Sequence, residues 1–262
     1  MTERAPAGTP APAASTGPTA STAPAASPTS STGLTTSTGP TAIRDAVRRL
    51  LDLAEQTGGV LPIVEAGDPV LRMTTAPVDG QLDDAELDAF AQAMITTMRT
   101  APGVGLAAPQ VGVPLRLFVA EDPVPAASTD PDAQARQDMR RRVPFGPRTV
   151  INAVYEATTD QTASFYEGCL SIPGYQAVVD RPLTIRLQGA DLAGASVDEE
   201  LTGWPARIVA HETDHLDGIL YLDSAQMRSL ATDEAVARWW GRADTREAAA
   251  VLGFEVPATS VF

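Results

Sequence analysis

Apolar residues recur at helical spacing in two long stretches near the start of the ordered pattern. In residues 42–56 they are three or four positions apart, with arginines and acids between them and a glycine pair behind. In residues 84–99 the large apolar side chains share one face and follow an aspartate that suits an N-cap. The spacing predicts an amphipathic N-terminal helix at 43–58, docked on the domain, and a second helix whose apolar face is mostly core.

Shorter apolar runs bounded by turn residues predict strands. These runs are residues 115–120, 149–155, 161–166, 177–179, 183–187 and 197–201. Helical spacing returns at residues 233–242 and 245–252, where Trp239 and Trp240 are expected to pack against the body of the domain.

Composition separates the first 42 residues from the rest. Apart from Met1, Glu3, Arg4 and Leu34, they are all Ala, Pro, Ser, Thr or Gly. Such a segment has too little apolar bulk to offset the entropy of ordering, so residues 1–42 are predicted to be a disordered tail. The tail has no apolar central run and a single arginine, so it resembles neither a secretory signal nor a transit peptide.

The remaining chain is long enough for one domain with a substantial core. We expect a catalytic domain at 59–223 and a helical C-terminal extension at 224–262. Residues 121–148, rich in Pro, Asp, Gln and Arg, are interpreted as a surface insertion within that domain. The arginines at 140–142 are expected to form a solvated loop.

Charge and cysteine content exclude several classes of protein. The net charge is −14, and all 19 basic residues are arginine, which argues against a DNA-binding surface. No run of about 18 apolar residues exists, so no membrane span is expected. The single cysteine rules out an internal disulfide and suits a reducing cytoplasm.

Both histidines of the chain fall in residues 210–218, which read Ala-His-Glu-Thr-Asp-His-Leu-Asp-Gly. His211 and His215 are four positions apart, so on a helix both rings leave the same face, about 40° and about 6 Å apart. Two imidazoles placed this way can hold one divalent metal, and Glu212 is then a carboxylate free to move protons.

Such a metal needs a third protein ligand, and the outstanding candidate is Cys169. Three ligands leave one coordination position open, which is the pattern of catalytic sites rather than structural ones. A glycine-rich stretch, residues 103–110, is predicted to be a tight loop whose backbone approaches a ligand closely, and its last residue is the polar Gln110.

These three segments together resemble the peptide deformylases. That family is marked by a Gly-x-Gly-Leu-Ala-Ala-x-Gln loop, a Glu-Gly-Cys-Leu-Ser segment and a His-Glu-x-Asp-His-Leu helix, found here at 103–110, 167–171 and 211–216. The similarity covers about residues 61–223. Ala210 departs from the glutamine that the family often has there.

The resemblance implies an α+β fold with small antiparallel β-sheets around a central helix that carries the HExxH motif. It also implies a bacterial, monomeric, cytoplasmic enzyme that removes the formyl group from the N-terminal formyl-methionine of new polypeptides. The family usually works with ferrous iron. The ligand set alone leaves Zn²⁺, Ni²⁺ and Co²⁺ open. The ribosome is a candidate partner.

The resemblance also assigns roles to individual residues. Glu212 transfers the proton, and the Gln110 amide and the Leu170 backbone N–H stabilise the oxyanion. The substrate backbone lies along Val104, Gly105 and Gly168. Trp204 and Ile208 are expected to line the methionine pocket. Glu167 and Arg181 are either a supporting pair behind the cysteine loop or a surface salt bridge.

Three alternatives stay open at the level of sequence. The first is a zinc metalloprotease that uses Asp217 or Asp223 as third ligand. The second is a deformylase relative acting on another N-acyl group. The third is a non-catalytic metal module, against which the free Glu212 and the three-ligand set both argue.

Overall fold

The computed structural model describes residues 40–124, 131–242 and 244–261. The chain divides into two units, Met1–Thr35 and Thr36–Phe262, and every described residue belongs to the second unit. The predicted tail therefore lies outside the described residues up to position 39. Residues 40–42, counted with the tail above, are already helical.

The described chain contains both helices and strands. The helices are α1 (Pro40–Gln56), α2 (Asp84–Thr100), α3 (Pro131–Met139), α4 (Trp204–Leu216), α5 (Asp233–Ala235) and α6 (Arg246–Leu252), with a π-helical turn η5 (Val236–Trp240) and 3₁₀ turns η1 (Pro69–Arg72), η2 (Ala108–Val111), η3 (Tyr221–Asp223) and η4 (Met227–Ser229). The strands are β1 (Gly105–Ala107), β2 (Leu117–Asp122), β3 (Phe145–Ala157), β4 (Thr162–Cys169), β5 (Ile172–Pro182), β6 (Thr184–Ala190), β7 (Ser196–Thr202) and β8 (Ala231–Thr232).

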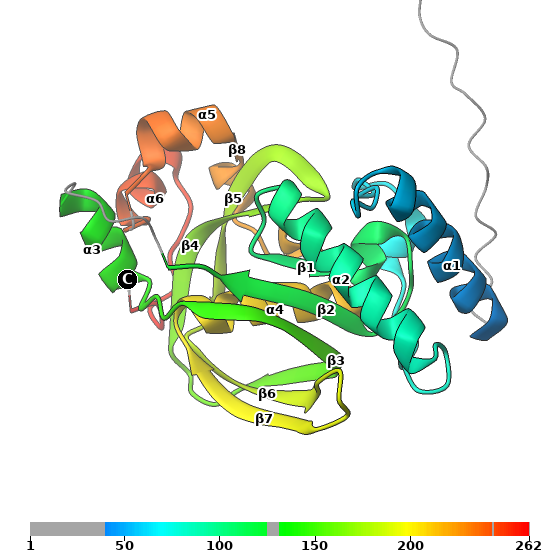
Figure 1. The fold of residues 1–262 in the computed structure, drawn as a ribbon. Coiled ribbons are helices and arrows are strands. Elements are labelled where there is room, and N and C mark those ends of the chain that lie inside the picture. Colours follow the sequence, from blue (N-terminus) through cyan, green and yellow to red (C-terminus); the bar gives the residue numbers. More distant parts are fainter. Residues whose placement is uncertain (1–39, 125–130, 243, 262) are drawn as a thin grey trace, which may run out of the picture. The chain divides into compact units, whose positions relative to one another are not determined.

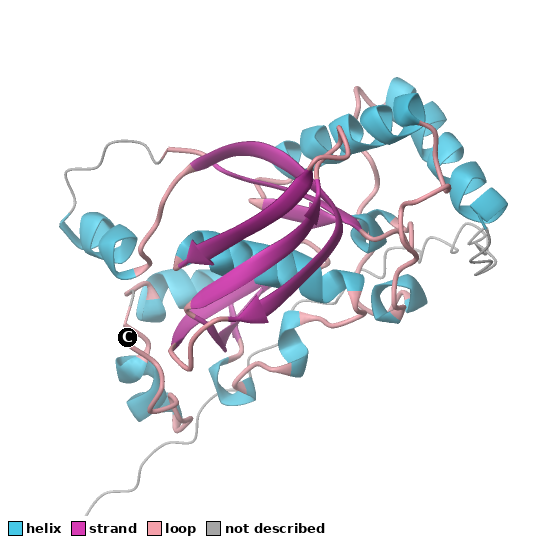
Figure 2. Cartoon of the chain, turned by 90° about the horizontal axis from the view of Figure 1, so that it is seen from below, coloured by secondary structure: helices cyan, strands magenta, loops and turns pink. Residues whose placement is uncertain are grey.

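The strands form two sheets around α4. One has the order β1-β2-β3-β6-β7 and the other β4-β5-β8, and every pair within them is antiparallel. Helix α4 contacts strands of both sheets, and the ribbons show the curved strands passing over it (Figures 1 and 2). The predicted α+β class with antiparallel sheets is therefore confirmed.

Strand β2 is the layer between two apolar clusters of the domain. Leu117 and Val119 belong to the apolar cluster shared with α1 and α2, whereas Phe118 and Ala120 belong to the cluster shared with α4. Side chains alternate between the two faces of a strand. An unbroken apolar run is therefore the pattern of a strand buried between α2 on one face and α4 on the other.

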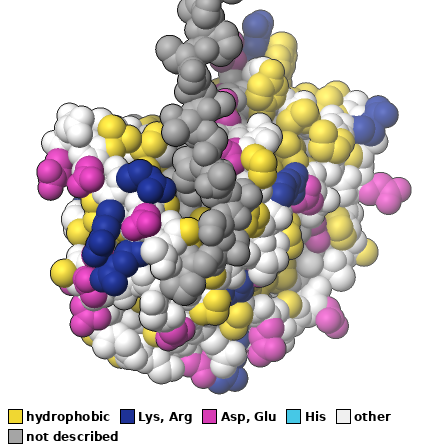
Figure 3. All heavy atoms as spheres, turned by 90° about the vertical axis from the view of Figure 1, so that its right-hand side faces the viewer, with side chains coloured by type: hydrophobic (Ala, Val, Ile, Leu, Met, Phe, Trp, Pro, Cys, Tyr) yellow, Lys and Arg dark blue, Asp and Glu magenta, His cyan; other side chains and the backbone are white. Residues whose placement is uncertain are grey.

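Helix α1 docks on α2, as its apolar spacing predicts. Ile43 and Val47 are buried in the same cluster as the α2 core residues. Arg44 and Arg48 both pair with Glu86, which also completes a capping box at the start of α2. On the α1 side of the molecule, acidic and basic side chains lie among neutral and apolar ones (Figure 3).

The described parts of the segment between β2 and β3 include regular structure. Strand β2 continues to Asp122 and β3 starts at Phe145, so both ends of residues 121–148 belong to the sheet. The expectation of a solvated arginine loop was wrong for Arg140 and Arg142, whereas Arg141 is exposed. Arg142 pairs with the fully buried Asp122, and the Arg140 guanidinium lies 4.3 Å from the centre of the Trp204 ring.

The C-terminal region is only partly helical. Strand β8 pairs with β5 and extends the three-stranded sheet, and the helices that follow it are short. Trp240 packs in a cluster with Val236 and Phe254, as expected. Trp239 is 62% exposed, so the prediction that both tryptophans pack against the body was wrong for this one. None of the helices within the described ranges is long and apolar enough to cross a membrane.

Candidate metal centre and active site

Helix α4 fixes the spacing of the two histidines. It begins at Trp204 with Pro205 in its first turn, where a missing backbone N–H costs nothing. Gly203 precedes it with a φ of 74°, and a Cβ at that position would come within 2.6 Å of Arg141. Only glycine suits such a junction. From this start, His211 and His215 fall on one face, with ring centres 5.0 Å apart.

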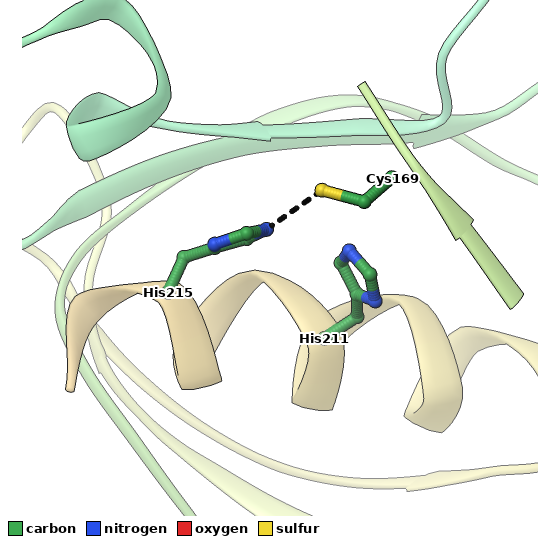
Figure 4. Close-up of side chains that lie close together, drawn as sticks. All are labelled: Cys169, His211 and His215. Carbon is green, nitrogen blue, oxygen red and sulfur yellow. Dashed lines mark hydrogen bonds between the residues drawn. The ribbon is translucent and has the colours of Figure 1, made fainter. Parts of the chain in front are cut away.

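The cysteine reaches the helix from the end of β4. Strand β4 ends at Cys169 and β5 starts at Ile172, and the pairing register shifts at this tight connection. The Cys169 Sγ lies 3.3 Å from Nε2 of His215, and its side chain points toward both rings (Figure 4). The three ligand atoms of Cys169, His211 and His215 all lie within 4.8 Å of one another.

A buried carboxylate network positions His211. Glu167 Oε2 lies 3.0 Å from Nδ1 of His211. The other ring nitrogen, Nε2, is therefore the one that faces Cys169. Glu167 also accepts hydrogen bonds from Arg181 and Arg207. Burial alone would raise the pKa of Glu167, but the charges of these two arginines hold it well below its usual range. The Glu167–Arg181 pair is therefore a buried support and not a surface salt bridge.

Arg181 links this network to the residue just before His215. Its Nη1 donates to Asp214 Oδ2 at 2.7 Å, and Asp214 Oδ1 accepts from the Tyr155 hydroxyl at 3.0 Å. Burial keeps the pKa of His215 well below its usual value. The neutral imidazole is the form that binds a metal.

The Glu212 side chain lies against Gly105 of the glycine-rich stretch. It is 4% exposed, and its Oε2 has no hydrogen-bond partner. Burial raises its pKa to about 7, against the opposing charges of His211 and Arg181. A Cβ on Gly105 would overlap the Glu212 carboxyl group, with the Cγ of Glu212 2.6 Å away. The space that Glu212 occupies therefore requires glycine at position 105.

The stretch predicted as a tight loop is partly a strand. Residues 105–107 form β1, paired with β2, and Gln110 follows in η2. The Gln110 Oε1 accepts from the Ala107 backbone N–H at 2.8 Å. This bond fixes the amide so that its Nε2 points to Cys169 Sγ and Ser171 Oγ, both at 3.4 Å. A hydrogen-bond donor is thus held beside the cluster.

A cavity of about 630 Å³ opens onto these groups. Its wall includes the residues that the sequence assigned to substrate and catalysis, namely Val104, Gly105, Gln110, Gly168, Leu170, Trp204, Ile208 and Glu212. Cys169 and His211 also line it, whereas His215 is buried with 1% exposure. The structure therefore brings together all the residues expected at the site.

Sequence reasoning missed four charged residues at or behind this cavity. Arg140, Arg207 and Asp233 line its wall, and Asp214 lies in the network behind it. Arg207 carries a signal that was available, since it precedes His211 by four positions and so shares its helix face. Arg140 and Asp233 carry none, because they reach the cavity from segments distant in sequence.

Three ligand-type side chains beside a buried carboxylate, at the wall of a cavity, fit the class of metal-assisted hydrolases. The comparisons narrow this class. A family model described as polypeptide deformylase matches residues 60–230. Peptide deformylase 3 of Streptomyces avermitilis is 54% identical over 217 residues, covering 82% of this chain and 94% of that protein. The peptide deformylase of Bifidobacterium adolescentis is 48% identical over 205 residues, covering 77% and 91%.

Solved structures of peptide deformylases are also similar to this chain. The peptide deformylase of Thermotoga maritima superposes with a TM-score of 0.52 and 34% identity over 64% of this chain and 98% of that chain. An enzyme of the same family from Acinetobacter baumannii, solved with Met-Ala-Ser bound, gives a TM-score of 0.55 and 31% identity over 63% and 98%. The chain belongs to the peptide deformylase family, so it is a hydrolase that removes the N-formyl group from newly made polypeptides. The family uses a divalent metal.

Proposed function

We propose that Cys169, His211 and His215 hold one divalent metal ion, most consistent with Fe²⁺, and that the cavity binds the N-terminus of a formyl-methionyl peptide. The observation that carries this proposal is the convergence of one sulfur and two imidazoles within 4.8 Å, next to a carboxylate oxygen that is buried without a partner. Thiolate and imidazole suit Fe²⁺, Zn²⁺, Ni²⁺ and Co²⁺ alike, so the choice of iron rests on the family.

The residues divide the chemistry between them. When bound, the metal supplies Lewis-acid polarisation of the formyl carbonyl and lowers the pKa of water. Glu212 accepts a proton from the attacking water at its carboxylate and returns it to the departing amine. Burial raises the pKa of Glu212, which favours a carboxyl group that can both accept and return a proton. The Gln110 Nε2 donates to the developing oxyanion, with the Leu170 backbone N–H as the second donor.

The substrate backbone is proposed to run between β1 and β4. Val104 and Gly105 form one side and Gly168 the other, and main-chain hydrogen bonds of this kind tolerate many downstream sequences. Trp204 and Ile208 are proposed to line the methionine pocket. The relative solved with Met-Ala-Ser supports this placement of a peptide that begins with methionine.

The proposed context is a cytoplasmic monomer acting on nascent chains, with the ribosome as a candidate partner. The family assignment decides against the zinc metalloprotease considered from sequence. Cys169→Ser separates the two classes directly, because a protease of that type would keep its metal after this change, whereas the proposed centre would lose affinity for it.

The test is formate release from formyl-Met-Ala-Ser by metal-reconstituted protein. Glu212→Ala should lower kcat/KM by about 100-fold or more while the bound metal, measured by elemental analysis, stays near one per chain. Glu55→Ala, on the exposed side of α1, is the matched control and should retain full activity. Acetyl-Met-Ala-Ser tests the other N-acyl groups. Equal rates on the acetyl and formyl peptides would refute the assignment to formyl.

A further inference from the structure

Arg140 is a cation in the cavity wall that forms no ion pair among the described residues. Its side chain lines the cavity beside Trp204, and its Nε is buried with no hydrogen-bond partner. No described carboxylate forms an ion pair with it. Buried donors in folded proteins are normally satisfied, and an arginine at a cavity whose Nε is buried without a partner points to a ligand.

The position of Arg140 is fixed by its backbone and its neighbours. Its carbonyl oxygen accepts from the Trp204 backbone N–H at 2.8 Å, which ties the end of the α3 segment to the start of α4. Its guanidinium stacks over the Trp204 ring at 4.3 Å and lies 5.9 Å from the Phe165 ring centre. A stacked guanidinium keeps its N–H groups in its own plane, free for acceptors at its edge.

The surrounding charges do not satisfy Arg140 either. Arg207 is compensated by Glu167, and Arg142 by Asp122. Burial, together with the nearby charges of Arg207 and Arg142, lowers the pKa of Arg140 to about 10, so it remains protonated at neutral pH. Asp233, another charged residue of the wall, accepts a hydrogen bond from Gln176 at 2.8 Å.

We propose that Arg140 is a specificity-determining residue that pairs with a carboxylate carried by a side chain of the peptide substrate. The inference rests on the proposed function and deepens it, because it names a preference within the formylated peptides. The protein as a whole carries a net charge of −14, which disfavours acidic peptides. A preference for peptides with an acidic side chain must therefore arise from the local contact with Arg140.

Three pairs of formylated tripeptides test which position supplies the carboxylate. Starting from formyl-Met-Ala-Ser, Glu or Gln replaces the residue at position 1, 2 or 3, and kcat/KM is measured for each. We expect wild-type protein to prefer Glu over Gln by about 10-fold at one of these positions, the size of a single charge-assisted contact. Arg140→Met keeps apolar contact with Trp204 and should abolish the preference, and Arg140→Lys should retain part of it.

The matched control is Arg242→Gln, which removes one positive charge at an exposed side chain that does not line the cavity. It should leave the Glu-to-Gln ratio unchanged. A purely structural role for Arg140 would lower the rates on all peptides equally, with the ratio preserved. Equal rates on Glu and Gln peptides at all three positions in the wild type, or a preference that survives in Arg140→Met, would overturn the proposal.

A binding measurement distinguishes failure of the Arg140 contact from failure of the proposed function. The unformylated peptides of the same series are titrated calorimetrically into wild type and Arg140→Met. If no peptide releases formate but the Glu peptide still binds about 10-fold more tightly than the Gln peptide in an Arg140-dependent way, the two proposals separate. The proposed function would be contradicted, and the contact with Arg140 would be supported. Equal Kd values for the Glu and Gln peptides would remove the contact.

Discussion

Glu167 and His211 form the contact through which the buried arginines act on the metal centre. The carboxylate Oε2 lies 3.0 Å from the ring Nδ1, and its two oxygens are shared with Arg181 and Arg207. The contact fixes which ring nitrogen faces Cys169 and increases the electron density on it. A residue that is not one of the three proposed metal ligands thus sets the orientation of one of them.

Replacing Glu167 by Gln should weaken metal binding by about 10–100-fold, because the acceptor of the His211 ring loses its charge. The change also leaves Arg207 buried without its ion-pair partner and leaves Arg181 paired with Asp214 alone, which should lower the free energy of unfolding by about 3–5 kcal/mol. Metal competition with a chelator and urea unfolding measure the two effects. Glu199→Gln, at the partly exposed pair with Arg148, should leave metal affinity unchanged.

Gly105→Ala should lower kcat while leaving the fold intact. Its added Cβ would collide with the Glu212 carboxyl group, so the carboxylate must move away from the position in which it transfers the proton. A displacement of about 1 Å at a reacting group can cost about 100-fold in rate. Circular dichroism and steady-state kinetics on formyl-Met-Ala-Ser follow this change.

The matched control for that substitution is Gly146→Ala. A Cβ at Gly146 would meet nothing within 4 Å, and its backbone lies outside the left-handed region. Its kcat should equal that of the wild type. Normal kcat in Gly105→Ala would show that Glu212 does not need the position seen here.

The attachment of α1 should weaken in acid. A hydrogen bond from Arg44 is the main cause that lowers the pKa of Glu86 from 4.5 to about 2. A carboxyl group with a lower pKa in the folded state binds fewer protons there than in the unfolded chain. Its contribution to stability is therefore present above pH 4.5 and is lost as the pH falls toward 2.

Glu86→Gln should accordingly flatten the loss of stability between pH 4.5 and 2, measured from urea midpoints. Glu55→Gln is the control, since Glu55 is exposed on α1 and has no ion pair among the described residues. If the Glu86 variant keeps the wild-type slope in this window, the Arg44 contact does not contribute to acid sensitivity.

Exposure to air should inactivate the iron-loaded protein faster than the nickel-loaded or zinc-loaded protein. A thiolate next to a redox-active ion oxidises readily, and Cys169 lies at the cavity wall. The measurement is residual formate release against time in air, with mass spectrometry of the peptide containing Cys169. Equal lifetimes for the iron and nickel forms would contradict this account.

The helices and the clustering of the two histidines could be predicted from sequence because each depends on spacing within one short stretch. Asp83 caps α2 and the apolar spacing defines it, and the interval from His211 to His215 places both rings on one face. The position of Cys169 beside them depends on strand pairing. It was predictable only because the chain contains a single cysteine and resembles a known family.

The parts that sequence missed depend on contacts between distant segments. Strand β1 has three residues, too few to show a period, and it exists because β2 pairs with it. Strand β8 has two residues and pairs with β5. Arg140 reads as a surface residue in a run of arginines until Trp204, 64 positions later, stacks against it.

The single thiol has a practical consequence for labelling this protein. Cys169 is the sole cysteine among 262 residues and belongs to the cavity wall. A maleimide fluorophore would therefore attach inside the pocket and nowhere else, and its rate of attachment would report how fully the pocket is occupied by ion or peptide. A dye meant for the outer surface needs an engineered cysteine and a filled pocket during the reaction.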